Sequence, residues 1–291
     1  MKIACYVSDT KRDKRLFEAL AKGFRKHGDT VELVSKTPAL IECGVVAADL
    51  AVYVGVRTSS LRVHVAAKRQ GQRTLMLDKG YFTRGSYHRF SLDYPQPSYL
   101  HRMSYDRERL TSFGITHVKQ HRNIVARDVV YVESTQKYYT FHGMGDVKLY
   151  SSRVCKQLVS AVSKSRRDLR VVYRPRAAAF GTIGPTPSGT YLADPSSQSF
   201  ASLLPFAYCV VIHGSNAGVE AMLAGVPVLS IGSCEVNPIH DIANQGMVNV
   251  LSLITPDEEV VMHRMAQLAW CQFDRQETAS GLAWEHVRRW L

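Results

Sequence analysis

The chain has 291 residues, of which 45% are hydrophobic, and a formal net charge of +12 at pH 7. That length accommodates two domains of ordinary size, and the composition is typical of a soluble globular protein. No apolar run approaches the ~20 residues of a membrane span, and the N-terminus enters a strand without a signal-peptide pattern. We therefore expect a cytoplasmic protein.

The excess of basic residues favours an anionic partner, which can be a nucleic acid, a nucleotide or a polyanionic acceptor. Net charge alone does not establish DNA binding, because several basic residues lie on expected helix faces. The six cysteines are scattered and form no CxxC pair. This spacing predicts reduced core cysteines and no metal site.

Strands and helices alternate through the first third of the chain. Strands are predicted over 2–7, 31–34, 51–56 and 73–78, and helices over 16–27 and 61–70. This β-α-β alternation predicts an open, doubly wound sheet, whose ligands bind beyond the carboxyl ends of the strands. The polar residues expected near that crevice are Asp9, Arg57, Thr58, Asp78 and Lys79.

The segment 80–106 differs in texture, with many aromatic, arginine, histidine and proline residues and no clear periodicity. Long irregular segments of this kind are often functional loops. Aromatic rings next to Arg and His can stack on sugars or bases and hold phosphates. We expect a functional loop here; the alternative is a folded connection in which Tyr and Phe are packing anchors.

The alternation resumes after a connection over 111–127. Strands are predicted over 129–132, 169–173 and 248–251, helices over 146–163 and 200–207, and helical structure from 256 onward. Arg174 and Arg176 directly follow one of these strands, where two guanidinium groups can clamp a diphosphate. The alternative is that both are ordinary surface charges.

The segment 209–232 is predicted to organise the second half as a compact β-α-β unit. The β-branched run 210–212 predicts a strand, 217–223 a helix and 226–231 the next strand, with Gly225 as the C-terminal cap. Between the first strand and the helix lies the turn His213-Gly214-Ser215-Asn216. Ser215 or Asn216 can cap the helix, whose free N–H groups form an anion site.

Small and acidic residues next to this turn extend the hypothesis. Gly214 and Gly218 would let a ligand approach the backbone, and Glu220 can meet a ribose hydroxyl. The alternative is a capped helix of an ordinary α/β domain, with His213 merely hydrogen-bonded.

The two predicted Rossmann-like halves and the sequence HGSNAGVEAMLAGVPVLSIG resemble GT-B glycosyltransferases, especially phage-encoded and capsule-type sugar transferases. DKGYF, STQKYYTFHGMGD, VVYRPR and LAWCQFDRQETASGLAW also resemble the phage group, so the likeness covers most of the chain. It implies α/β architecture with two Rossmann-like domains facing each other across a cleft. We expect an acceptor domain over 1–120, a nucleotide-sugar donor domain over 121–268, and a C-terminal helix over 269–291 packing back on the body.

The resemblance also implies roles for individual residues. The donor diphosphate would be held by Gly214, Ser215 and Asn216 and neutralised by Arg174 and Arg176, with His213 and Glu220 near the phosphates, ribose or sugar. The resemblance implies that the donor needs no bound metal, and the sequence has no DxD triplet. The base would come from the first domain, with Asp78 ranked first and Asp9, His88 and Asp93 as the other candidates.

The resemblance predicts an enzyme that moves a sugar from a nucleotide-sugar donor, with UDP-sugar as first choice, to a hydroxyl group. Phage relatives and the basic charge suggest a 5-hydroxymethylpyrimidine in duplex DNA as acceptor, in the host cytoplasm if the chain is phage-encoded. The predicted acceptor loop comprises Asp9, Tyr81, Phe82, Arg84 and Tyr87, which would hold a flipped base. The alternatives are a capsule or cell-envelope glycan transferase, and a non-catalytic nucleotide- or nucleic-acid-binding module.

Overall fold

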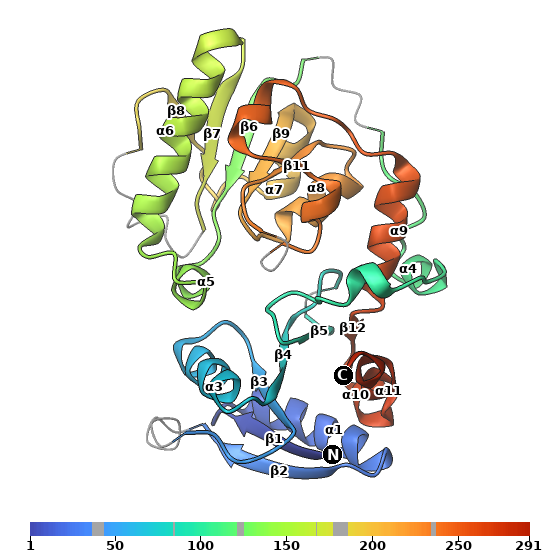
Figure 1. Cartoon of the computed structure of the whole chain (residues 1–291). Coiled ribbons are helices and arrows are strands. Elements are labelled where there is room, and N and C mark those ends of the chain that lie inside the picture. Colours follow the sequence, from blue (N-terminus) through green and yellow to red (C-terminus); the bar gives the residue numbers. More distant parts are fainter. Residues whose placement is uncertain (37–43, 84, 121–124, 167, 177–185, 234–236) are drawn as a thin grey trace. The chain divides into compact units, whose positions relative to one another are not determined.

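The computed structural model describes residues 1–36, 44–83, 85–120, 125–166, 168–176, 186–233 and 237–291. The chain divides into two compact units (Figure 1). The first comprises residues 1–109 together with 267–291, and the second comprises residues 110–266. The C-terminal segment therefore belongs to the same compact unit as the N-terminus.

The described strands of the first unit form one six-stranded sheet. In sheet order they are β12 (Gln272–Phe273), β5 (His88–Leu92), β4 (Arg73–Lys79), β3 (Leu50–Val54), β1 (Lys2–Val7) and β2 (Thr30–Ser35). The strands from β4 to β2 are parallel, and they connect through α1 (Lys11–Lys26) and α3 (Thr58–Arg69). Thr10 caps α1 by accepting from the N–H of Asp13. The predicted doubly wound alternation is confirmed, with element ends shifted by a few residues.

The segment 80–106, predicted to be irregular, contains a strand. β5 pairs antiparallel with β4, and β12 pairs antiparallel with β5, so two distant segments extend the parallel sheet. Phe90 of β5 packs edge to face against Phe273 of β12 with ring centroids 5.4 Å apart. The run His-Arg-Phe-Ser-Leu has too few apolar residues to be recognised as a strand from its sequence. One of its two partner strands, β12, lies far away in the sequence.

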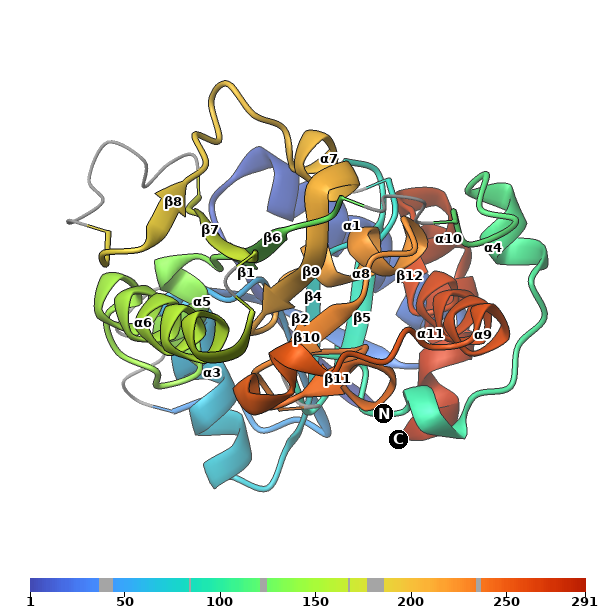
Figure 2. The same cartoon turned by 90° about the horizontal axis from the view of Figure 1, so that it is seen from above.

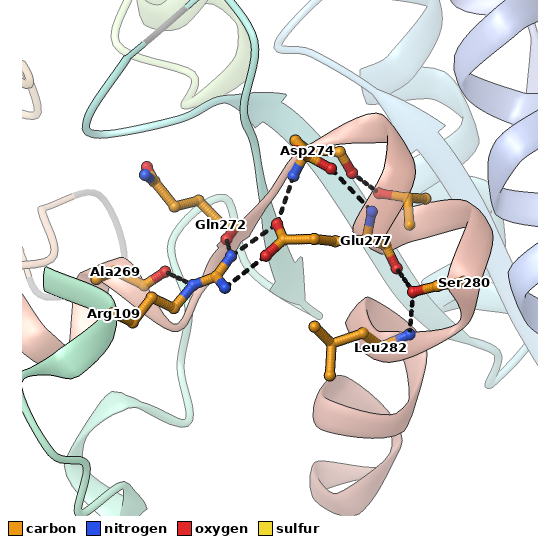
Figure 3. Close-up of polar contacts among 8 residues, drawn as sticks. Arg109, Ala269, Gln272, Asp274, Glu277, Ser280 and Leu282 are labelled. Carbon is orange, nitrogen blue, oxygen red and sulfur yellow. Dashed lines mark hydrogen bonds and ion pairs between the residues drawn. The ribbon is translucent and has the colours of Figure 1, made fainter. Parts of the chain in front are cut away.

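The C-terminal segment is fastened to the first unit by Arg109, at the start of α4 (Glu108–Ser112) (Figure 3). Its guanidinium donates to the Glu277 carboxylate at 2.6 and 2.8 Å and to the carbonyls of Ala269 and Gln272. Glu277 also closes a capping box with Asp274 at the start of α10 (Arg275–Ser280). One bidentate ion pair thus joins the chain before the second unit to the chain after it.

The chain ends in α11 (Leu282–Val287) and a 3₁₀ turn, η6 (Arg288–Trp290). Its tryptophans pack against other aromatic rings of the first unit: the ring centroids of Trp284 and Phe24 are 4.7 Å apart, and Trp290 and Trp270 stack on Tyr99 and Tyr105. All three tryptophans of the chain lie in the first unit, so their fluorescence reports the folding of that unit alone.

This reporter permits a prediction for acid unfolding. His286 is 4% exposed, and its burial lowers the pKa of the imidazole to about 4. The unfolded imidazole has a pKa near 6.5, so between about pH 6.5 and 4 the unfolded chain binds a proton that the folded chain does not. Stability should therefore fall as the pH decreases through this window, by about 1–3 kcal/mol from His286 alone. Urea titrations followed by tryptophan fluorescence measure this, and His286→Phe should flatten the slope; an unchanged slope would contradict the assignment.

The described strands of the second unit form a six-stranded, fully parallel sheet. In sheet order they are β11 (Asn244–Gln245), β10 (Val228–Ser230), β9 (Ala207–Ile212), β6 (Asp128–Val132), β7 (Arg170–Arg174) and β8 (Thr190–Leu192). The α-helices are α5 (Gln136–Phe141), α6 (Val147–Ser165), α7 (Phe200–Leu203), α8 (Ala217–Leu223) and α9 (Glu258–Ala269), whose end reaches the first unit.

Helices cover both faces of this sheet, as Figure 2 shows for α6 and α8. Cys209 and Val211 of β9 share a buried cluster with Leu158 of α6, whereas Ile212 faces Gly218 of α8. Parallel sheets covered on both faces need nearly continuous apolar strands, and the AYCVVI of β9 fits that requirement.

Two predictions in this unit are wrong. The segment predicted as a strand over 248–251 lies in a 3₁₀ turn, η5 (Met247–Leu251), and the neighbouring strand is Asn244–Gln245. The many Gly, Pro, Ser and Thr residues of 177–197 predict a loop, but residues 190–192 form the edge strand β8. Both are short edge structures, where pairing with the sheet decides and local sequence is a weak guide.

The four described cysteines, Cys5, Cys155, Cys209 and Cys271, are buried and free. Cys43 and Cys234 lie outside the described residues. Within the described ranges, we find no helix with the length and apolar character needed to cross a bilayer.

Candidate functional site

The carboxyl ends of β6, β7 and β9 meet at one edge of the second sheet, because the three strands are parallel and in register. Glu133, Arg174 and His213 lie at or just beyond these ends. Ligands of open parallel sheets bind outside this edge. The predicted donor residues are therefore brought together by the sheet.

The turn before α8 differs from the predicted cap. Asn216 stands at the N-cap position but makes no capping hydrogen bond through its side chain, and Ser215 Oγ accepts from the N–H of Ala217 at 3.3 Å. The helix has only seven residues, so its dipole is small. Charged side chains must therefore supply most of the electrostatic attraction for an anion at this edge.

Gly218 serves packing, which corrects its predicted role in ligand approach. A Cβ atom at this position would lie 2.3 Å from Cδ1 of Ile212 and 2.8 Å from Cδ1 of Ile239. The glycine therefore lets α8 lie directly on β9. Glu220, two residues after Gly218, is exposed in the first turn of the helix.

His213 is held as a neutral imidazole. Its Nδ1 lies 2.7 Å from the hydroxyl of Tyr150, and the rings of Tyr138, Tyr139 and Tyr150 surround it. Burial lowers the pKa of His213 to about 4. At neutral pH the residue can donate or accept a hydrogen bond but carries no charge for a phosphate.

Arg174 faces the acidic residue of α8. Its Nη2 donates to the carbonyl of Gln198 at 3.5 Å, and its guanidinium lies 5.9 Å from the ring centroid of Phe200. Burial lowers the pKa of Arg174, and the charge of Glu220 opposes that shift. Its Nε is buried and has no hydrogen-bond partner among the described residues. The exposed Arg176 adds a second cation two residues on.

Glu133 is a residue of this edge that the sequence analysis missed. It is 3% exposed, and its carboxylate accepts from the hydroxyls of Tyr173 and Ser151 at 2.5 and 2.9 Å. It also accepts from the N–H of Arg176 at 3.1 Å, and its own N–H donates to the carbonyl of Arg174. The chain that carries both arginines is thereby fastened to β6 at two points.

Removing the Glu133 carboxylate should release the arginine segment. Glu133→Ala leaves the N–H of Arg176 and two buried hydroxyls without their acceptor, at a cost of about 1–3 kcal/mol each if they stay unpaired. We expect the dissociation constant for a nucleoside diphosphate to rise about tenfold or more, measured by isothermal titration calorimetry. Tyr173→Phe is the matched control, because it removes one donor to Glu133 and keeps the Arg176 bond. Equal affinities of both variants would contradict the role of Glu133.

The carboxyl edge of the first sheet carries a second polar group of residues. Asp13, in the first turn of α1, is 4% exposed and accepts from Nη1 of Arg57 at 3.2 Å and from the hydroxyl of Ser8. His88 pairs in register with Lys79 and lies 3.5 Å from Nη2 of Arg12. Burial, and next the charge of Arg12, lower the pKa of His88. Its Nδ1 is buried without a hydrogen-bond partner in the described chain.

The predicted bases do not lie together. Asp78 is paired with Arg89 at 3.1 Å at the carboxyl edge, near His88. Asp93 lies at the opposite edge, because β5 runs antiparallel; it accepts from the N–H of Thr74 at 2.9 Å and pairs with Arg73 at 2.6 Å. Asp93 therefore secures the start of β4, and its assignment as a base is wrong.

Two of the five residues of the predicted acceptor loop are packed inside the first unit. Tyr81 and Phe82 are 3% and 8% exposed, and the Tyr81 hydroxyl donates to Gln96. Tyr87 is half-buried, Asp9 is exposed beside Lys14, and Arg84 lies outside the described residues. The alternative of aromatic packing anchors thus describes Tyr81 and Phe82. Among the described residues, no group of three potential metal ligands occurs.

The sequence matches no family model and no curated protein. Solved structures do resemble it over most of its length. The KpsC beta Kdo 2,7 transferase of Thermosulfurimonas dismutans covers 97% of this chain and 98% of its own, with a TM-score of 0.54 and 12% identity. The fold is of the GT-B type.

Two further structures complete the comparison. The KpsC beta Kdo 2,4 transferase of the same organism has a TM-score of 0.51 and 9% identity over 91% of this chain and 90% of its own. MnaA of S. aureus, solved with UDP, has 10% identity over 99% of this chain and 96% of its own. Its TM-score of 0.36 is too low to relate the two folds. At such identities the likeness establishes two Rossmann-like domains and leaves the reaction to the site residues.

Proposed function

We propose that the chain is a glycosyltransferase that moves a sugar from a nucleotide-sugar donor to a hydroxyl acceptor. The observation that carries this proposal is the convergence of Arg174, Glu220 and His213 at the carboxyl edge of the second sheet. Two arginines and an exposed acid beside a neutral histidine match a diphosphate joined to a ribose or sugar. The GT-B fold, shared with sugar transferases, supports it.

In this proposal the second unit, residues 110–266, contains the donor domain that the sequence predicts over 121–268. Arg174 and Arg176 neutralise the diphosphate as it leaves, which lowers the barrier without a metal ion. Glu220 accepts from ribose or sugar hydroxyls, while His213, Gly214, Ser215 and Asn216 line the phosphate side. A UDP-sugar stays the first choice of donor.

The first unit supplies the acceptor side and the base. His88 fits the base better than Asp78, since its lowered pKa keeps it neutral at pH 7, whereas Asp78 is engaged by Arg89. The hydroxyl proton of the acceptor would pass to the imidazole as the oxygen attacks the anomeric carbon and the bond to the diphosphate breaks.

We propose two candidate acceptors for the transferred sugar. Duplex DNA with 5-hydroxymethylpyrimidines is favoured by the net charge of +12, although Tyr81 and Phe82 are too buried to hold a flipped base. An anionic glycan is favoured by the same charge and needs no flipped base.

The test is a transfer assay with labelled UDP-, GDP- and CDP-sugars. Duplex DNA, with and without 5-hydroxymethylpyrimidines, and an acidic glycan serve as acceptors. Label that enters only the modified DNA establishes the DNA acceptor, and label in the glycan establishes the other. Nucleotide binding without turnover would make the chain a binding module and overturn the proposal.

A further inference from the structure

We infer that the first unit holds a site for an anionic group, a phosphate or carboxylate, built by Lys36, Arg57, Asp13 and Ser60, here called the Lys36–Arg57 cluster. Two cations from different strand ends lie there near one buried carboxylate, Asp13, which pairs with Arg57. If the proposed function holds, this anion belongs to the acceptor substrate, which narrows its chemical class; the anion site itself does not depend on that function.

The sheet brings the cluster together. Lys36 follows β2, and its N–H donates to the carbonyl of Val7 at the end of β1. Arg57 precedes α3, just beyond the end of β3. Both cations therefore stand at the carboxyl edge, where open parallel sheets bind their ligands.

The position of the Lys36 amine is fixed by Ser60. Nζ donates to Ser60 Oγ at 2.6 Å, and the fully buried Ser60 hydroxyl itself donates to the carbonyl of Val54 at 2.8 Å. No carboxylate lies within ion-pair distance of Lys36 in the described chain. The amine thus has a neutral oxygen as its partner, and no ion pair neutralises its charge.

The charges of the cluster do not balance. The Asp13 carboxylate is engaged by Arg57 and Ser8, which leaves Lys36 as an excess cation. Burial, and next the nearby charge of Arg57, lower the pKa of Lys36 to about 8, while Asp13 opposes the shift. Holding two cations together in a half-buried place costs folding free energy, and a bound anion would offset that cost.

An anion between the two cations would gain from both. The side chain of Arg57 is 43% exposed, so a ligand can approach it beyond its bond to Asp13. Arg provides a fork for carboxylate or phosphate oxygens, and Lys adds a point charge. The cluster therefore fits one carboxylate or phosphate group on a small molecule or on a chain.

The test compares three sugars by isothermal titration calorimetry on the full chain: glucose 6-phosphate, glucuronate and neutral glucose. We expect at least one anionic sugar to bind ten times more tightly than glucose, and the stronger of the two identifies phosphate or carboxylate as the group. Lys36→Met should abolish this margin, that is, the difference in affinity between the anionic sugar and glucose. This variant is preferable to a change at Arg57, because Ser60 keeps its bond to Val54 and Asp13 keeps its cation.

Lys2→Met is the matched control. Lys2 begins β1 at the opposite edge of the same sheet, and its amine lies 3.8 Å from Glu32 on the surface. The control should keep the margin between anionic and neutral sugars. Equal binding of all three sugars by the unmodified protein, or a margin that survives in Lys36→Met, would overturn the inference.

A second measurement needs no variant. At pH 7.5 about a quarter of an amine with a pKa near 8 is deprotonated, against about 0.1% of an ordinary lysine. Lys36 should therefore be acylated early in a timed labelling experiment read by mass spectrometry, and the anionic sugar should slow that labelling at least fivefold. An equal rate of Lys36 labelling in the presence of glucose and of the anionic sugars would also overturn the inference.

The same experiments separate the two proposals. UDP binding without anion protection of Lys36 removes the anion site and keeps the donor site. Protection of Lys36 in a chain that binds no nucleotide and transfers no sugar removes the proposed function and keeps the anion site.

Discussion

An Arg176→Ala protein is expected to fold normally and to lose sugar transfer by a factor of about 100 to 1000. The negative charge on the donor diphosphate grows as the sugar leaves, and a prepositioned donor to such charge contributes about 2.7–4 kcal/mol to the transition state. Arg176 is exposed, and Glu133 accepts from its backbone N–H at 3.1 Å, so the position of its backbone is fixed by the fold. The effect should appear in kcat/KM of the transfer assay.

The control for this experiment is Arg166→Ala. Arg166 lies before β7, at the amino-terminal edge of the same sheet, and forms a surface pair with Asp168 at 2.9 Å. Its removal should leave turnover unchanged, because exposed ion pairs contribute little. Arg176→Lys should recover part of the activity by keeping the charge and losing the fork. Wild-type turnover in Arg176→Ala would remove this residue from the site.

A Gly23→Ala protein is expected to lose about 1–3 kcal/mol of stability or more. In an isolated helix the same change would stabilise by about 1 kcal/mol, so the sign depends on packing. A Cβ at Gly23, in the last turn of α1, would lie 2.2 Å from the carbonyl oxygen of Thr278 in α10. That atom is backbone, so α10 itself must move, and it carries Glu277, the partner of Arg109.

Tryptophan fluorescence is the readout, because all three tryptophans lie in the first unit. Gly85→Ala is the matched control: a Cβ there meets nothing within 4 Å, and the glycine has no positive φ. We expect the urea midpoint to fall for Gly23→Ala and to stay near the wild-type value for Gly85→Ala. A midpoint for Gly23→Ala at or above that of the wild type would show that α10 does not pack on α1 in this way.

Local patterns predicted much of the parallel framework. The strand 2–7 and the helix 217–223 have the predicted bounds, and Gly225 takes the positive φ of +73° expected after a helix. These elements can be recognised from a few residues of sequence, because a buried parallel strand is continuously apolar and a helix end often needs a left-handed backbone angle.

Long-range pairing was beyond the reach of such patterns. β5 becomes a strand because β4 and β12 flank it, and β12 lies near the other end of the chain. Asp93 was a candidate base from its sequence, but the antiparallel direction of β5 places it at the opposite edge of the sheet. Strand pairing and strand direction decided these two cases, and neither can be predicted from a short stretch of sequence.

The site shows the same division. Arg174, His213 and Glu220 were predicted because they follow strands or open a helix. Glu133 also follows a strand, but its importance comes from Tyr173 and Ser151, which are 40 and 18 residues away. Lys36 resembles any surface lysine in sequence, and only the fold places it beside Arg57 and Ser60.

Amide hydrogen exchange with and without UDP tests the central claim most directly, namely that the donor binds at the carboxyl edge of the second sheet. The account predicts slower exchange in peptides that cover 213–220 and 174–176, with Arg176→Ala losing most of that protection. Protection confined to the first unit, or none at saturating UDP, would contradict the donor site and with it the proposed reaction.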